Sequence, residues 1–145
     1  MILAPNRSRQ LTFWALAVAL PVLATTPAAA ADLTGYWSGY WQSCTTGHTG
    51  PLEATFCRIN ASQYRADFSG RFFKLVPFRY SVILDVIHEE DDTVELAGSS
   101  YLGRLFGMFR YQAEATGCNF TADYASCKDN GQFVLCRAGG CEMSR

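Results

Sequence analysis

Few residues in this sequence have the types and spacing that chemistry requires. The two histidines, His48 and His88, fall at opposite ends of the domain described below, so we expect no shared metal or acid–base site. Residues 89–92 are four consecutive acids beside His88, and carboxylate oxygens suit calcium. Their spacing lacks an ordered ligand pattern, which favours a solvated charged loop. No nucleophile motif such as Gly-x-Ser-x-Gly is present. An enzyme is the least favoured interpretation, and we expect no cofactor and no metal.

The six cysteines all follow residue 43. In a small exported chain an even number of cysteines indicates disulfides. A zinc site is the alternative, but it usually has a tight Cys-x-x-Cys pair, which this sequence lacks. Sequence alone allows about fifteen ways to pair six cysteines. Sorting them by the end of the domain at which they fall predicts three disulfides, Cys44–Cys127, Cys118–Cys141 and Cys57–Cys136.

The N-terminus has the pattern of a secretory signal peptide. Arg7 and Arg9 precede a short apolar stretch at 11–23, and the alanines at 28–31 provide a small-residue cleavage site. We expect cleavage of residues 1–31, a single domain over 32–145, and a secreted or periplasmic protein that does not span a membrane after cleavage. A retained N-terminal anchor is the alternative, although the apolar stretch is short for a bilayer. Beyond residue 31 the sequence has ten basic and 13 acidic side chains, and this net negative charge argues against nucleic-acid binding.

Apolar and polar residues alternate along most of the sequence after residue 33, and short turn signals interrupt the pattern. The alternation predicts an all-β domain with eight antiparallel strands and short connections. An up-and-down barrel removes exposed strand edges and is favoured over a two-sheet β-sandwich. An outer-membrane barrel is disfavoured because the predicted outer face carries many charges. The predicted strands are 34–43, 51–59, 63–73, 76–88, 93–99, 104–115, 118–127 and 132–137.

One end of the predicted barrel has a recognisable set of residues. Gly35 and Trp37 begin the first strand, and Arg137 ends the last strand, which lies beside the first once the barrel closes. A guanidinium over an indole contributes about 0.5–2 kcal/mol. This set resembles the calycins, the lipocalin- and avidin-like barrels, in which a Gly-x-Trp and an arginine close one end. The resemblance implies that Gly35, Trp37 and Arg137 form a structural base and that the opposite end is an open mouth.

The two ends differ in chemistry. The connections around 71–78 and 101–106 are apolar with interleaved basic residues, whereas the opposite end is acidic or small. The first hypothesis is therefore a non-catalytic barrel that binds a small apolar or amphipathic ligand at its mouth. The alternative is a barrel plugged by its own aromatics, which acts through its mouth loops on a protein partner, as an inhibitor or envelope interaction module. The candidate ligand-binding residues are Trp41, Phe72, Phe73, Phe78, Tyr80, Arg104, Phe106, Phe109 and Tyr111.

Overall fold

Buried and exposed side chains alternate along the strands, as the sequence pattern predicts. In β6 (Met108–Ala115) every second residue from Phe109 to Ala115 is buried, and the residues between them are exposed. The strand β7 (Asn119–Ala125) repeats this pattern. Successive side chains of a strand point to opposite faces, so each of these strands has one face for a core and one for water. A sheet built from such strands buries its apolar face most completely by curling around it.

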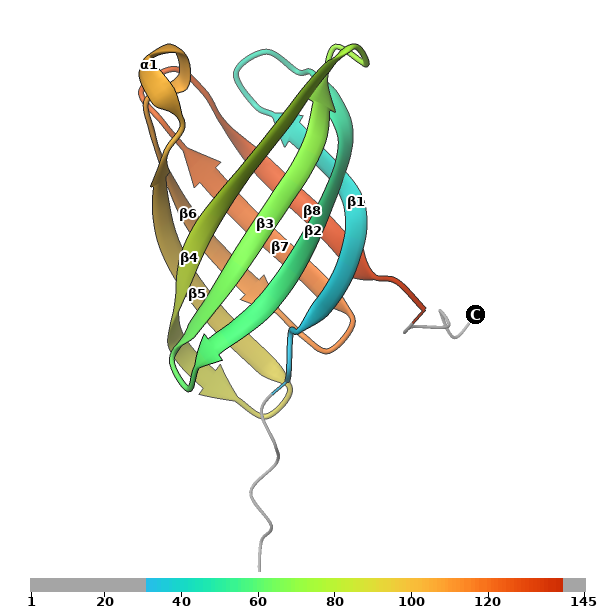
Figure 1. The fold of residues 1–145 in the computed structure, drawn as a ribbon, viewed down its shortest axis with the longest axis vertical. Coiled ribbons are helices and arrows are strands. Elements are labelled where there is room, and N and C mark those ends of the chain that lie inside the picture. The colour runs from blue at the N-terminus through green and yellow to red at the C-terminus, as the bar shows by residue number, and fades with distance from the viewer. Residues whose placement is uncertain (1–30, 140–145) are drawn as a thin grey trace, which may run out of the picture.

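The strands form a closed, antiparallel, up-and-down barrel in the computed structural model, which describes residues 31–139 (Figure 1). Each strand pairs with its sequence neighbours, and β1 closes the ring by pairing with β8, with Trp37 opposite Arg137. This confirms the eight-stranded barrel, and the two-sheet sandwich is not formed. The other strands are β1 (Gly35–Ser43), β2 (Thr49–Asn60), β3 (Gln63–Phe72), β4 (Val76–Glu90), β5 (Thr93–Tyr101) and β8 (Asn130–Arg137).

The segment before β6 differs from the prediction. The predicted strand 104–115 begins only at Met108, because α1 (Gly103–Phe106) forms a single helical turn first. Gly103 begins this turn and Gly107 follows it, with φ values of 82° and 77°, in the left-handed region that glycine adopts without steric cost. The Gly107 N–H donates to the Gly103 carbonyl at 2.8 Å and closes the turn. Within residues 31–139, no helix is long and apolar enough to cross a membrane.

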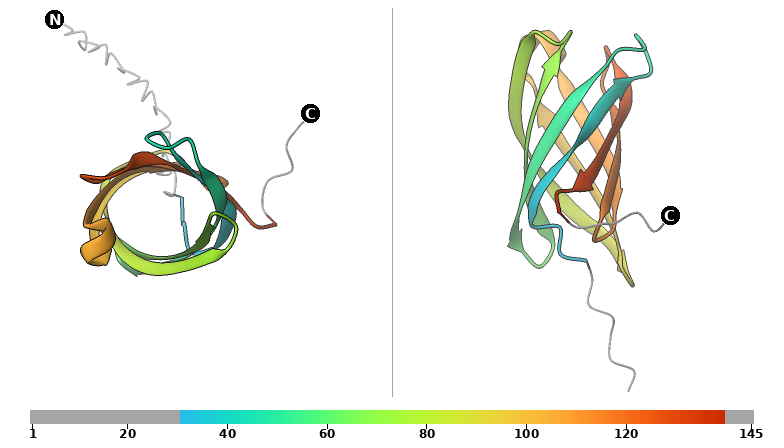
Figure 2. Two further views of the ribbon diagram at one scale, coloured as in Figure 1. Left: turned by 90° about the horizontal axis from the view of Figure 1, so that it is seen from above. Right: turned by 90° about the vertical axis from the view of Figure 1, so that its right-hand side faces the viewer.

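The barrel has two distinct ends, which we call the apical end and the base. The apical end carries the β1–β2 loop, the β3–β4 turn, α1 and the β7–β8 turn (Figures 1 and 2). The base carries the other three turns together with the first and last described residues. The first and last described residues therefore lie at the end opposite the four apical connections.

Aromatic rings fill the lower barrel above the base. Trp37, Phe56 and Phe120 are no more than 1% exposed, and their ring centroids lie 4.9–6.5 Å apart. Phe68 joins this group through Phe56 at 6.1 Å. Burying each of these side chains contributes about 1.5–3 kcal/mol, so this cluster is a main source of stability in a small domain.

Candidate functional site

The three predicted base residues lie together. The guanidinium carbon of Arg137 is 4.8 Å from the centroid of the Trp37 ring. Arg137 also donates hydrogen bonds to the carbonyls of Gly117 and Thr34, both at 2.8 Å, and to that of Asp32. A Cβ atom on Gly35 would lie 3.4 Å from the Arg137 Nη1 atom, and Gly35 has a φ of 130°. The arginine thus closes the base by joining β8 to the N-terminal segment and to the β6–β7 turn, and glycine suits the position beneath it.

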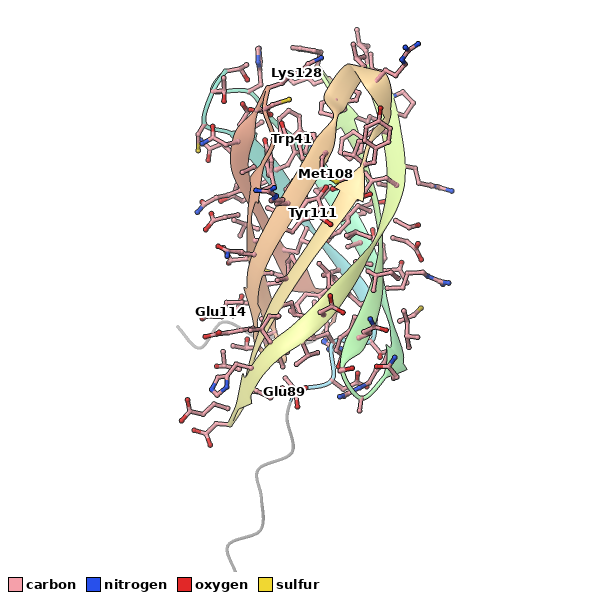
Figure 3. The ribbon with its side chains drawn as sticks, turned by 90° about the vertical axis from the view of Figure 1, so that its left-hand side faces the viewer. Trp41, Glu89, Met108, Tyr111, Glu114 and Lys128 are labelled. Atoms are coloured by element: carbon pink, nitrogen blue, oxygen red, sulfur yellow. The ribbon has the colours of Figure 1, made fainter. Side chains whose placement is uncertain are left out.

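The predicted ligand-binding residues divide into two sets. Trp41 and Tyr111 lie in the upper part of the barrel (Figure 3), where Phe109 is buried with them and Phe72, Phe78 and Tyr80 are partly buried against the core. Phe106 is 38% exposed and stacks on Phe72 at 5.6 Å. The structure places Phe73 and Arg104 outside instead, where both are exposed to solvent.

The rings in the upper barrel pack against each other. Phe72 contacts Trp41 at a centroid distance of 5.3 Å and Phe78 at 4.4 Å. The series continues through Tyr80 to Tyr111 at 6.3 Å. Offset ring pairs at such distances are attractive, so the rings stabilise each other where the first hypothesis requires space for a ligand.

Two hollows open instead on the outer face of the barrel. One, of about 560 Å³, lies over β2, β3 and β4 towards the apical end, and Arg71, Arg79 and Glu53 are its charged lining residues. The other, of about 960 Å³, crosses the outer face from β4 to β8 and is lined mainly by outward-facing residues such as Asp85, Gln112 and Asp123. These hollows are open surface features, and the first holds two cations and one acid in the apical half.

Tyrosine hydroxyls give the upper barrel a polar component. The Tyr124 hydroxyl donates to the Asp129 carboxylate at 3.0 Å. The Tyr111 hydroxyl is buried and forms no hydrogen bond of normal geometry among residues 31–139, although it interacts with the Tyr80 hydroxyl. Burial raises the pKa of Tyr111 to about 12 and raises that of Tyr80 well above its ordinary value. Both side chains therefore stay neutral across the physiological pH range and act as hydrogen-bonding groups.

The apical connections are joined into a single surface. The rings of His48 and Phe73 lie 4.9 Å apart and link the β1–β2 loop to the β3–β4 turn. Figures 1 and 2 place α1 and the β3–β4 turn on different sides of the apical end, and the Phe72–Phe106 stack connects them. Lys128 donates to the Leu105 carbonyl at 2.7 Å and ties α1 to the β7–β8 turn.

This apical surface exposes large apolar side chains. Leu75 is 83% exposed, and Leu105 is 70% exposed. They stand at the tips of the β3–β4 turn and α1, with further apolar residues close by in sequence. We call the following seven residues the apical patch: Phe73, Leu75, Val76, Tyr101, Leu105, Phe106 and Met108.

The cations near the patch have no partners within the described chain. Five basic side chains of the apical half form neither an ion pair nor a side-chain hydrogen bond with any residue of 31–139: Arg71, Lys74, Arg79, Arg104 and Arg110. In the lower half, by contrast, Arg58 lies 3.6 Å from Glu89 and Arg65 lies 3.2 Å from Asp67. Many of the acids lie towards the base, where Figure 3 places Glu89 and Glu114, whereas Asp129 lies in the apical β7–β8 turn and Glu53 lines the hollow that holds Arg71 and Arg79. The apical half therefore has an excess of basic side chains, and the acids at 89–92 lie at the opposite end.

Two predicted disulfides are wrong, because Cys44, Cys57, Cys127 and Cys136 are free. Both cysteines can be placed by the residues of β1 that lie beside them. Cys136 lies opposite Ser38, whereas Cys57 comes one residue after the partner of Gly35 and so lies level with position 34. The two cysteines are therefore offset by four residues along β1, about 13 Å. A disulfide requires Cα atoms within about 7 Å.

Cys44 and Cys127 are separated by β8. The Cys44 N–H donates to Asn130, the first residue of β8, and Asn130 pairs with Ala125 in β7. Two strand spacings make about 9.6 Å, which is again too far for a disulfide. Cys118 is not among the free cysteines, and its predicted partner Cys141 lies outside the described residues, so that pairing stays a prediction. Residues 1–30, which hold nearly all of the predicted signal peptide, also lie outside them.

The remaining polar candidates stay apart. His48 lies at the apical end, whereas His88 lies near the base, 3.6 Å from Glu90. In the part of the chain that the structure describes, no group of three or more metal-ligating side chains is placed to hold an ion. Leu75, Leu105 and Arg110 were not among the candidate binding residues predicted from the sequence. The strand alternation and the loop positions could have identified them, because both place these side chains on the outside. The chain shows no significant match to a known protein family, to a curated protein or to a solved structure.

Proposed function

We propose that this chain is an exported, non-catalytic binding module that contacts its partner through the apical end of the barrel. One observation carries the proposal: seven large apolar side chains are exposed among five unneutralised cations at the same end of the molecule. Large exposed apolar side chains gathered at one end of a small domain are typical of an interaction surface. The unpaired cations give that surface a preference for anionic partners.

This proposal develops the plugged-barrel alternative of the sequence analysis. It is supported by the ring series from Trp41 to Tyr111, in which the side chains of the inner surface pack against one another. It is also supported by the placement of Phe73 and Arg104, two of the predicted ligand contacts, on the outside. The function then depends on the outer apical surface, and the aromatic interior serves to hold the four apical connections in place.

Site-specific photo-crosslinking of the exported protein in its own cells tests the proposal. A photoreactive phenylalanine analogue replaces Leu75 in the apical patch or, as a matched control, Ile87, which is 62% exposed near the base. We expect crosslinks to a protein or to lipid from position 75 and few from position 87. Equal crosslinking at both positions, or none at position 75, would contradict an apical binding surface.

A small ligand in the upper barrel is the second candidate function. The observation that favours it is the buried Tyr111 hydroxyl, which forms no hydrogen bond of normal geometry among the described residues and lies among rings that suit an apolar ligand. Binding would require the rings to separate. Native mass spectrometry of protein purified from its own host tests this candidate, because a bound molecule would add a defined mass to the folded protein. Loss of that added mass in Tyr111→Phe would support a polar contact at this hydroxyl.

A further inference from the structure

Building on the proposed function, we infer that the apical end docks on the surface of an anionic phospholipid bilayer. The apical patch would enter the boundary between headgroups and acyl chains, and the surrounding cations would contact lipid phosphates. Such docking is peripheral and leaves the barrel itself outside the bilayer. The inference depends on the shape, the conformation and the charge of the apical end, which are considered in turn.

The shape of the patch suits a deformable partner. Its most exposed side chains, Leu75 and Leu105, project from the tips of a turn and a single helical turn, and do not line a groove. Projecting apolar side chains need a partner that can close around them. The headgroup region of a bilayer does so without requiring a complementary rigid surface.

The backbone conformation of the β3–β4 turn indicates that its side chains have a functional role. Phe73 and Lys74 have φ values of 52° and 63°, both in the left-handed region, and the Leu75 N–H closes the turn on the Phe72 carbonyl at 3.1 Å. Successive left-handed residues in a hairpin turn favour Asn-Gly or similar pairs. A phenylalanine and a lysine there are strained, and strain of this kind concentrates at functional positions. The sequence places one apolar and one cationic group at the tip, the two groups that a lipid surface recognises.

The charge distribution orients the molecule towards an anionic surface. Arg71, Lys74 and Arg104 flank the patch, and Arg79 and Arg110 follow slightly farther down the outer face. Each basic side chain near an anionic membrane contributes about 1 kcal/mol, or a factor of about five in affinity. The acids around residues 89–92 lie at the far end, where repulsion from the same surface is weakest. Because no described residue holds these cations in place, they can follow mobile headgroups, whereas a rigid protein partner would need a fixed acid opposite each one.

Co-sedimentation with vesicles tests the inference on the mature chain. We expect the protein to sediment with vesicles of phosphatidylcholine and phosphatidylglycerol, and at least about tenfold less with phosphatidylcholine alone, from the contribution of each cation. High salt should weaken the binding, because the screening length falls from about 10 Å at 0.1 M to about 3 Å at 1 M.

Two double variants locate the contact without endangering the fold. Phe73→Asn with Lys74→Gly places preferred residues in the strained turn, so the barrel should fold at least as well while vesicle affinity falls more than about tenfold. Leu75→Ser with Leu105→Ser removes only exposed side chains and should have a similar effect. The matched control is Ile59→Ser with Ile87→Ser, which removes exposed apolar groups near the base and should bind like the wild type.

Equal binding to both kinds of vesicle, binding to neither, or apical variants that bind as well as the wild type would each overturn the inference. The crosslinking experiment above separates this failure from that of the proposed function. A protein crosslinked at position 75 together with absent vesicle binding would refute the lipid surface and leave the apical binding module standing. Absent crosslinks at that position together with absent vesicle binding would refute both.

Discussion

Arg137 covers the indole of Trp37 at 4.8 Å, and the two residues are also direct partners across the seam where β8 meets β1. The contact therefore closes the barrel and seals its base at the same position. The same guanidinium donates to three backbone carbonyls from the N-terminal segment and the β6–β7 turn. One side chain thus holds together segments that are more than 100 residues apart in sequence.

Replacing this arginine should destabilise the whole domain. Arg137→Ala removes the contact with the Trp37 ring, worth about 0.5–2 kcal/mol, and charged hydrogen bonds worth about 1.5–3 kcal/mol each, which do not add fully. We expect the free energy of unfolding in urea to fall by about 3 kcal/mol. Arg65→Ala is the control, because its ion pair with Asp67 is solvent-exposed and should change stability by less than about 1 kcal/mol. Equal effects of the two substitutions would show that the base does not depend on Arg137.

The base and the strands were predictable because they follow from local patterns. Alternation fixes which residues face inward, and closure of an even meander brings Trp37 next to Arg137. The disulfides were not predictable in this way, because the offset between Cys57 and Cys136 depends on the stagger of strands around the barrel. Phe73 was predicted as a ligand contact because its connection is apolar, and composition alone does not fix the direction in which the side chain of a turn residue points.

Gly39, in the middle of β1, should not tolerate a side chain. A Cβ atom there would lie 2.0 Å from the Val134 carbonyl oxygen in β8, so Gly39→Ala must push the two strands apart at the seam of the barrel. We expect this overpacking to lower the free energy of unfolding by about 2–3 kcal/mol, measured by urea denaturation. Gly117→Ala is the matched control, because its nearest contact would be an ordinary 3.6 Å to the Asp92 carboxylate. If both variants unfold at the same urea concentration, β1 and β8 do not approach as closely as described.

Tyr111 and Tyr124 should respond oppositely to loss of their hydroxyls. The Tyr111 hydroxyl is buried and forms no hydrogen bond of normal geometry among the described residues, and its interaction with Tyr80 does not meet that geometry, so Tyr111→Phe should leave stability unchanged or raise it. Tyr124→Phe removes the hydrogen bond to Asp129 and should lower stability by about 1 kcal/mol. Urea denaturation of the two variants gives the comparison. A clear loss of stability in Tyr111→Phe would mean that its hydroxyl is satisfied in solution, by water or a bound molecule.

Alkaline pH should destabilise the barrel through its buried tyrosines. Burial raises the pKa of Tyr111 to about 12, whereas an unfolded tyrosine titrates near 10, so the folded state favours the protonated hydroxyl. The stability linked to this residue is therefore fully present below about pH 10 and is lost as pH rises towards 12, by about 1.4 kcal/mol per pH unit. Tyr80 and Tyr124 act in the same direction, because burial also raises their pKa values. The urea midpoint, measured from about pH 8 to pH 11, should fall only above about pH 10, and less steeply in Tyr111→Phe than in the wild type. An unchanged slope in that variant would show that Tyr111 ionises in the folded barrel as easily as in the unfolded chain.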